Sequence, residues 1–196
     1  VSDLYSYPNE LQLVDMSGDG LAEWLEMSAS IFSTMAADGI VRPLLLPGAV
    51  PYNFDVIDGL TYRINLAVPA RYDIDGKRAP DGSRRIGALQ YKGQPVMPEQ
   101  RFLVVTNSFR ASGGGHFPGL GMERVVASSH AANRDILAAY IADRGTVECH
   151  ERPIWCFAET GGARVNFDTG PGAAHHLHEI AGFAPVAQGM TEEGYV

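Results

Sequence analysis

A short apolar run, residues 102–105, is followed after a few polar positions by three consecutive glycines, residues 113–115. Because the run is aromatic, aliphatic and β-branched, we predict a buried strand. The glycines allow the backbone to turn tightly and to approach another group closely. Phe109 lies between the strand and the glycines, where its flat face would be free for stacking. The alternative is a strand followed by a flexible loop, with Phe109 in the ordinary core, and the pattern alone leaves both open.

The size and charge of the chain restrict the class of protein. Its 196 residues suit a single medium-sized domain, which can bury a hydrophobic core without disulfide bonds or metal ions to stabilise it. The net charge of -8 argues against a nucleic-acid backbone as the partner. There is no run of 18 apolar residues, and the first residues lack a signal-peptide pattern, so we expect neither a membrane span nor a leader here.

Two helices and several strands are expected from side-chain periodicity. Apolar residues recur at helical spacing from about Leu21 to Met35 and again from about Ala131 to Asp143. Strands are expected over residues 10–15, 60–68, 86–91, 102–105 and 164–168. The strand at 86–91 and the strand at 102–105 are expected to be antiparallel neighbours. The pattern predicts an α+β (mixed α/β) domain, in which a mixed, partly antiparallel sheet packs with two main helices.

A possible calcium loop begins at Asp15. The spacing of Asp15, Ser17, Asp19, Gly20 and Glu26 matches the EF-hand template, with Glu26 at the position of the bidentate carboxylate. However, the residues before Asp15 alternate like a strand, whereas an EF-hand needs an entering helix. The same residues also suit a capped turn that starts a helix. A non-catalytic, calcium-stabilised interaction module is therefore kept as the alternative function.

The two cysteines, Cys149 and Cys156, do not show whether the protein lies in an oxidising or a reducing compartment. Two free thiols are expected, and a disulfide that closes a short loop is the alternative in an oxidising compartment. Geometry decides between these states, so the sequence leaves the question open.

Several separate motifs, in one order, resemble a known family. They lie at residues 52–59 (YNFDVIDG), 69–73 (PARYD), 102–114 and 133–139 (NRDILAA). Together they resemble the C-terminal domain of bacterial 2',3'-cyclic-nucleotide 2'-phosphodiesterase/3'-nucleotidases, a branch of the 5'-nucleotidase family. The resemblance is dense over residues 1–141 and looser over 142–196. It implies that residues 1–196 are a single domain and a fragment of that substrate-binding domain.

The resemblance also implies different roles for the two domains of the full-length proteins. Full-length members are exported, periplasmic or cell-surface hydrolases, whose N-terminal metallophosphoesterase domain holds two divalent metal ions and performs the chemistry. The C-terminal domain binds the nucleoside and stacks the base between two aromatic side chains. We therefore expect this chain to be the nucleoside-recognition portion of such an enzyme. Its expected partners are a nucleoside or nucleotide and the N-terminal domain of the same polypeptide, rather than a nucleic-acid duplex or a membrane. No catalytic residue, metal or cofactor is expected in this chain, which should be inactive alone.

The substrate-binding residues follow from the family motifs. The first stacking aromatic would be Tyr7, Asn9 would hydrogen-bond the base edge, and Phe109 would be the second aromatic. Stacking contributes ~1–3 kcal/mol per base and tolerates different bases. The residues that complete the expected substrate site are Arg110, Gly113 and Gly114. The 5'-nucleotidase branch has an aspartate that contacts the nucleoside at the position of Gly115, so this chain departs from the pattern there.

Overall fold

A computed structural model describes residues 5–148, 153–192 and 194–196. The strands are β1 (Glu10–Ser17), β2 (Val41–Pro43), β3 (Leu60–Ile64), β4 (Ile86–Tyr91), β5 (Gln94–Pro95), β6 (Arg101–Asn107), β7 (Val125–Ala132), β8 (Trp155–Phe157) and β9 (Arg164–Asn166). The α-helices are α1 (Gly18–Ser28), α2 (Ser108–Ala111) and α3 (Asn133–Arg144). The 3-10 helices are η1 (Ala29–Ile31), η2 (Pro51–Asn53), η3 (Met122–Arg124) and η4 (Pro171–Phe183). The predicted α+β class is confirmed.

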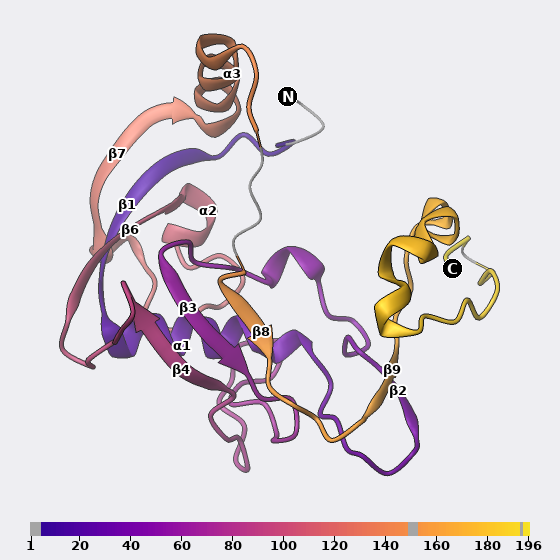
Figure 1. Cartoon of the computed structure of the whole chain (residues 1–196). Helices are drawn as coiled ribbons and strands as arrows, with labels where there is room; N and C mark the ends of the chain where they lie inside the picture. Colours follow the sequence, from indigo (N-terminus) through magenta and orange to yellow (C-terminus); the bar gives the residue numbers. More distant parts are fainter. Residues whose placement is uncertain (1–4, 149–152, 193) are drawn as a thin grey trace.

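The first sheet is antiparallel and has the order β6-β1-β7, with β1 in the middle (Figure 1). Leu13 on β1 lies opposite Val105 on one side and Ala127 on the other. Alternate side chains of β1 are buried, among them Val14 and Met16, as the predicted alternation over residues 10–15 requires. This sheet places the segment before β1 beside the segment after β6.

The second sheet has the order β5-β4-β3-β8 and is mixed. β3 pairs antiparallel with β4 and parallel with β8. The expected pairing of residues 86–91 with the strand at 102–105 is wrong, because β6 pairs with β1 instead. The chain turns at Lys92 and Gly93, and β5 then occupies the free edge of β4. A ring contact between Tyr91 and Phe102, with centroids 5.4 Å apart, joins the two sheets.

β6 differs in burial from the predicted strand at 102–105. Phe102 and Val104 pack against the core, but Leu103 is 65% exposed and Val105 is 60% exposed. The prediction of a strand is confirmed and that of full burial is wrong. The reason is that successive side chains of β6 point to opposite faces, and only the face with Phe102 and Val104 packs against the core.

Helix α1 supplies much of the core that the two sheets share (Figure 1). Ser17 caps its start, and the Ser17 Oγ accepts a hydrogen bond of 3.1 Å from the Gly20 amide. The predicted helix over residues 21–35 is correct in type but too long. After η1 the backbone becomes extended at Phe32, because the next amide, that of Ser33, donates to the Leu44 carbonyl at 2.9 Å.

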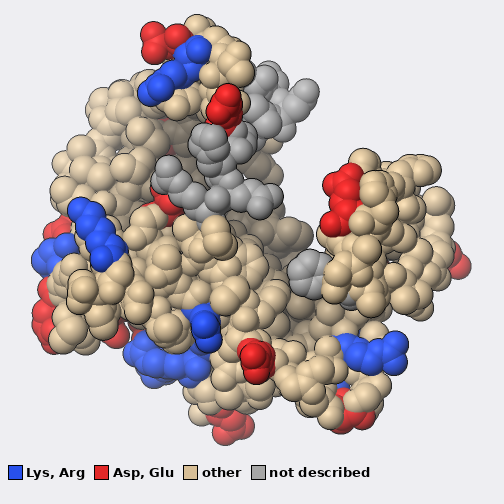
Figure 2. Space-filling view, in the orientation of Figure 1, with Lys and Arg blue, Asp and Glu red and all other residues tan. Residues whose placement is uncertain are grey.

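Helix η4 stands apart from this core, whereas β8 belongs to the second sheet. The buried hydrophobic residues run from Val14 to Phe117, and η4 lies in a separate lobe beyond β9 (Figures 1 and 2). The prediction of one domain over residues 1–196 stays a prediction.

Helix α3 confirms the expected helix at about 131–143. Within the described ranges, no helix is both long and apolar enough to cross a membrane. Cys149 lies outside the described residues, and Cys156 is exposed on β8.

Candidate functional site

Phe109 lies in the one-turn helix α2, directly after β6. Asn107 caps this turn, and its Oδ1 accepts a hydrogen bond of 2.8 Å from the Arg110 amide. The Phe109 side chain is 44% exposed, so the alternative that places it in the ordinary core is wrong. An aromatic ring that is half free at the end of a rigid strand is available for stacking on a flat ligand.

Tyr7 lies three residues before Glu10, the first residue of β1. Because β1 and β6 are antiparallel and Leu11 lies opposite Asn107, the start of β1 lies beside the start of α2. A hydrogen bond of 3.1 Å from the Glu10 amide to Ser108 Oγ fixes this arrangement. Tyr7 is 57% exposed. Two exposed aromatic side chains therefore flank this contact: Tyr7 is three residues before Glu10, and Phe109 is one residue after Ser108.

The glycine loop after α2 lies against the Phe109 ring. The Gly114 amide donates to the Phe109 carbonyl at 2.9 Å. A Cβ atom at Gly114 would lie 2.6 Å from Cε2 of Phe109 and 2.5 Å from its carbonyl oxygen, closer than real Cβ contacts allow. The loop can therefore take this path only while residue 114 lacks a side chain.

Arg110 is buried beneath this loop and is only 3% exposed. Its Nε lies 2.7 Å from Asp55 Oδ2, and its Nη2 donates to Asp55 Oδ1 at 2.9 Å. It also donates to the Gly114 carbonyl. Its guanidinium carbon lies 3.8 Å from the centroid of the Phe117 ring and 5.6 Å from that of Phe109. Arg110 thus fixes the loop from below.

Asp55 connects Arg110 to the core helix α1. Its Oδ2 accepts a hydrogen bond of 2.8 Å from Trp24 Nε1, and its carbonyl accepts one of 2.6 Å from Ser28 Oγ. The sequence motifs at 52–59 pointed to this segment but not to the role of Asp55. Only the three-dimensional pairing with Arg110 identifies it as the residue that couples the loop to the core.

The departure at Gly115 has a structural counterpart. Gly115 has a φ of +78°, and a Cβ atom there would lie 2.6 Å from Asn53 Oδ1 and would also overlap Nη1 of Arg110. The space that a side chain would need is already filled by the groups that hold the loop. In this arrangement an aspartate does not fit at position 115.

Asn9 belongs to a hydrogen-bond network that sequence motifs did not reveal. The Asn9 Nδ2 donates to the Tyr5 hydroxyl at 3.2 Å, and the Asn133 Nδ2 donates to the same hydroxyl at 3.1 Å. The Asn133 amide donates to the Asn9 carbonyl at 2.8 Å. Asn133 is the first residue of α3, so this helix anchors the backbone and side chain of Asn9.

A hollow of about 920 Å³ runs along the free edge of β6. Its lining includes Trp24, the segment 54–58 and residues 100–107, but neither Tyr7 nor Phe109. Asn107, the cap of α2, is the lining residue nearest to Phe109 in the sequence. We place the candidate site at Tyr7 and Phe109, where the exposed ring faces and the hydrogen-bonding side chain of Asn9 lie on adjacent segments.

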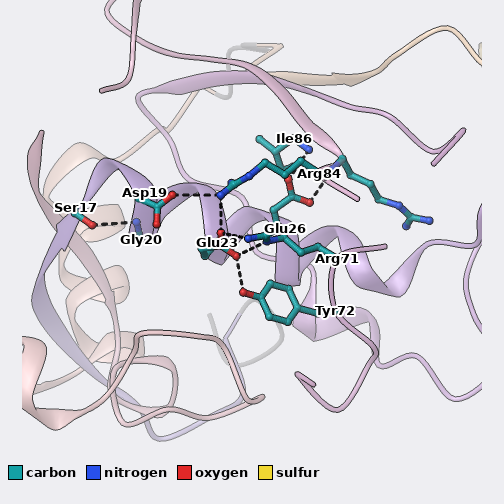
Figure 3. Close-up of polar contacts among 10 residues, drawn as sticks. Ser17, Asp19, Gly20, Glu23, Glu26, Arg71, Tyr72, Arg84 and Ile86 are labelled. Atoms are coloured by element: carbon teal, nitrogen blue, oxygen red, sulfur yellow. Dashed lines mark hydrogen bonds and ion pairs between the residues drawn. The ribbon is translucent and has the colours of Figure 1, made fainter. Parts of the chain in front are cut away.

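The glutamates of α1 form hydrogen bonds and ion pairs within the fold, and are not arranged around a calcium ion (Figure 3). Glu23 accepts hydrogen bonds from Arg71, Tyr72 and Arg84, with oxygen–nitrogen distances of 2.7 Å and 2.9 Å to Arg71. Partial burial raises the pKa of Glu23, but these hydrogen bonds and positive charges outweigh it and hold the pKa below its ordinary value. Glu26 is fully buried and accepts from the Arg85 and Ile86 amides at 2.9 Å and 3.0 Å. Burial raises the pKa of Glu26.

The calcium-loop interpretation is wrong. Asp15 lies within β1, Ser17 caps α1, and Glu26 is turned into the core, so these residues do not surround a common point. In the part of the chain that the structure describes, no group of three or more His, Cys, Asp and Glu side chains could hold a metal ion. These residues therefore do not fit a divalent metal centre, and no chemical step is assigned to one here.

Figure 2 shows the Lys and Arg residues of the visible face in separate small groups, without a continuous basic surface. This distribution agrees with the net charge of -8 and gives that face no extended contact for a phosphate backbone.

The sequence is similar to a known family and to several known proteins. The family model for the 5'-nucleotidase C-terminal domain matches residues 1–121. The trifunctional nucleotide phosphoesterase protein YfkN of Bacillus subtilis is 42% identical over 170 residues, which are 86% of this chain and 12% of that protein. The 2',3'-cyclic-nucleotide 2'-phosphodiesterase/3'-nucleotidase of Haemophilus influenzae is 38% identical over 205 residues, which are 99% of this chain and 31% of that protein.

A solved structure supports the fold. The chain matches a crystal structure of a Staphylococcus aureus 5'-nucleotidase with a TM-score of 0.64 and 21% identity, over 81% of this chain and 29% of that one. The chain thus spans about a third or less of the length of these relatives.

Proposed function

The chain belongs to the 5'-nucleotidase C-terminal domain family, and from this premise we propose that it recognises the nucleoside part of a nucleotide for a phosphoric-ester hydrolase. The observation that carries the proposal is the pair of exposed rings of Tyr7 and Phe109 on adjacent segments. Stacking on an aromatic face tolerates different bases, and two such faces hold a base from both sides. In this proposal the base enters between the two rings.

The remaining site residues divide into those that contact the ligand and those that support it. Asn9 contacts the edge of the base. Gly113, with a φ of +92°, and Gly114, whose Cβ atom would overlap the Phe109 ring, shape the loop beside the stacking face. Arg110 is buried against Asp55, so we assign it to holding the loop rather than to touching the substrate. This assignment refines its expected place among the substrate-binding residues.

The chemical step is assigned to another part of the polypeptide. By analogy with the longer relatives, we propose an intact 2',3'-cyclic-nucleotide 2'-phosphodiesterase/3'-nucleotidase, exported to the periplasm or cell surface. Its two divalent metal ions would be held by a separate N-terminal domain that performs the hydrolysis. Residues 1–196 alone should then release no phosphate from 3'-AMP in the presence of divalent metal ions. Metal-dependent release of phosphate by the pure chain would contradict this assignment.

Isothermal titration of adenosine and 3'-AMP tests the binding proposal. Since stacking contributes ~1–3 kcal/mol per base, Phe109→Ala should weaken binding about 5- to 150-fold. Phe167→Ala is the matched control, because Phe167 is a 55% exposed aromatic residue outside the candidate site. Equal affinities for wild type and Phe109→Ala would refute the stacking role. The absence of binding to the wild type would favour a scaffold that keeps the fold without recognising nucleotides.

A further inference from the structure

We propose that Tyr5 and Asn133 hold the amide of Asn9 in one orientation, so that the site selects bases with an exocyclic amino group, adenine or cytosine, over bases with a carbonyl at that position. The inference rests on the proposed nucleoside site and adds to it the class of base. Tyr5 and Asn133 act as positioning residues, since they reach the ligand only through Asn9.

The Tyr5 hydroxyl is the shared acceptor that orients the Asn9 amide. It accepts one hydrogen bond from Asn9 Nδ2 at 3.2 Å and one from Asn133 Nδ2 at 3.1 Å. A hydroxyl oxygen has two lone pairs for acceptance, and both are used. The Asn9 amide therefore directs its NH₂ group towards Tyr5, and its oxygen is directed away from it.

The backbone of Asn9 is held as well. The Asn133 amide donates to the Asn9 carbonyl at 2.8 Å, and Asn133 is the first residue of α3. Two hydrogen bonds from one residue to the Asn9–Tyr5 unit, one from the main chain and one from the side chain, restrict both the position and the rotation of the amide. This order is present before a ligand binds, so little freedom is lost on binding.

The oxygen of Asn9 remains available. No group of the described chain donates a hydrogen bond to Asn9 Oδ1, and this atom lies on the segment that carries Tyr7. An amide oxygen can only accept hydrogen bonds. The exocyclic amino groups of adenine and cytosine donate, whereas the carbonyl oxygens of hypoxanthine and uracil only accept. A base of the second kind would place two acceptors against each other.

The size of the effect follows from the cost of an unmatched polar contact. Leaving a desolvated acceptor without its donor lowers affinity by roughly 5- to 150-fold. We therefore expect adenosine to bind the wild-type chain more tightly than inosine by a factor in this range. Cytidine should be favoured over uridine in the same direction.

The test measures dissociation constants of adenosine and inosine for the wild type, Tyr5→Phe and Asn133→Ala. Tyr5→Phe removes the shared acceptor and frees the amide to turn, so the adenosine-to-inosine preference should fall towards one. Adenosine affinity should fall by less than the preference does. Tyr140→Phe is the matched control, because Tyr140 is an exposed tyrosine on α3 and should keep the wild-type preference.

The outcomes separate this inference from the proposed function. If adenosine binds and Phe109→Ala weakens it, but inosine binds the wild type equally well or better, the inference on Asn9 is overturned and the stacking site stands. If Tyr5→Phe lowers the affinity for both nucleosides by the same factor, Tyr5 is merely structural and the positioning role is overturned. If neither nucleoside binds the wild type, the proposed function itself fails and the inference fails with it.

Discussion

A Cβ atom at Gly114 would lie 2.6 Å from Cε2 of Phe109, so the loop and the ring can be neighbours only because residue 114 is glycine. The Gly114 amide also donates to the Phe109 carbonyl at 2.9 Å, which closes the turn after α2. The position of the proposed stacking face thus depends on the backbone path of the loop and not on the ring alone.

Gly114→Ala should displace the Phe109 ring or the loop. Forcing a methyl group into a filled space costs typically ~1–3 kcal/mol, and we expect a loss of stability in that range together with weaker adenosine binding. Thermal unfolding and isothermal titration measure the two effects. Gly172→Ala is the control, since a Cβ atom there meets nothing within 4 Å and the backbone is not left-handed. Unchanged adenosine affinity in Gly114→Ala would show that the ring does not depend on this glycine.

Asp55→Ala should destabilise the chain strongly. It would leave the buried Arg110 guanidinium without its carboxylate and Trp24 Nε1 without its acceptor. Removing one partner of a buried ion pair costs roughly 3–5 kcal/mol, and urea unfolding would measure the loss. Asp38→Ala provides the comparison, because its pair with Arg42 is on the surface and should contribute little. Similar, small effects in both variants would mean that Arg110 is held by other groups.

Glu23 and Glu26 should contribute to the pH dependence of stability in opposite directions. The pKa of Glu23 is lowered in the fold, so its contribution is present above the ordinary value of 4.5 and is lost as the pH falls below it. The pKa of Glu26 is raised by burial, so its contribution is largest below 4.5 and decreases as the pH rises towards the raised value.

Urea unfolding across this pH range distinguishes the two residues. Glu23→Gln should reduce the loss of stability on acidification below pH 4.5 relative to wild type. Glu26→Gln should remove the decrease in stability that wild type shows as the pH rises above 4.5. If both variants change the profile in the same direction, the opposite shifts in pKa are not the cause.

Local patterns in the sequence were sufficient for the elements that they span. Alternation predicted β1, helical spacing predicted α3, and the glycines at 113–115 predicted the tight turn after β6. Each of these depends on residues close in the sequence. The proposed place of Tyr7 in the site rests on the family resemblance, because no local pattern connects it with Phe109.

Non-local contacts account for what the sequence did not reveal. The pairing of β6 with β1 depends on a partner far away in the chain, and the end of α1 depends on bonds to the segment near Leu44. The pair formed by Asp55 and Arg110 joins the segment after η2 to helix α2, and spacing cannot reveal it. The calcium interpretation failed for the same reason, since spacing did not show that Glu26 is turned into the core.

The most direct measurement of the central claim is a nuclear Overhauser experiment on the labelled chain with saturating adenosine. If the base lies between the two rings, its protons should show contacts to ring protons of both Tyr7 and Phe109, and the Phe109→Ala variant should lose them. Contacts only to residues of the hollow along β6, such as Trp24, would contradict the account. So would the absence of contacts to either ring at saturation.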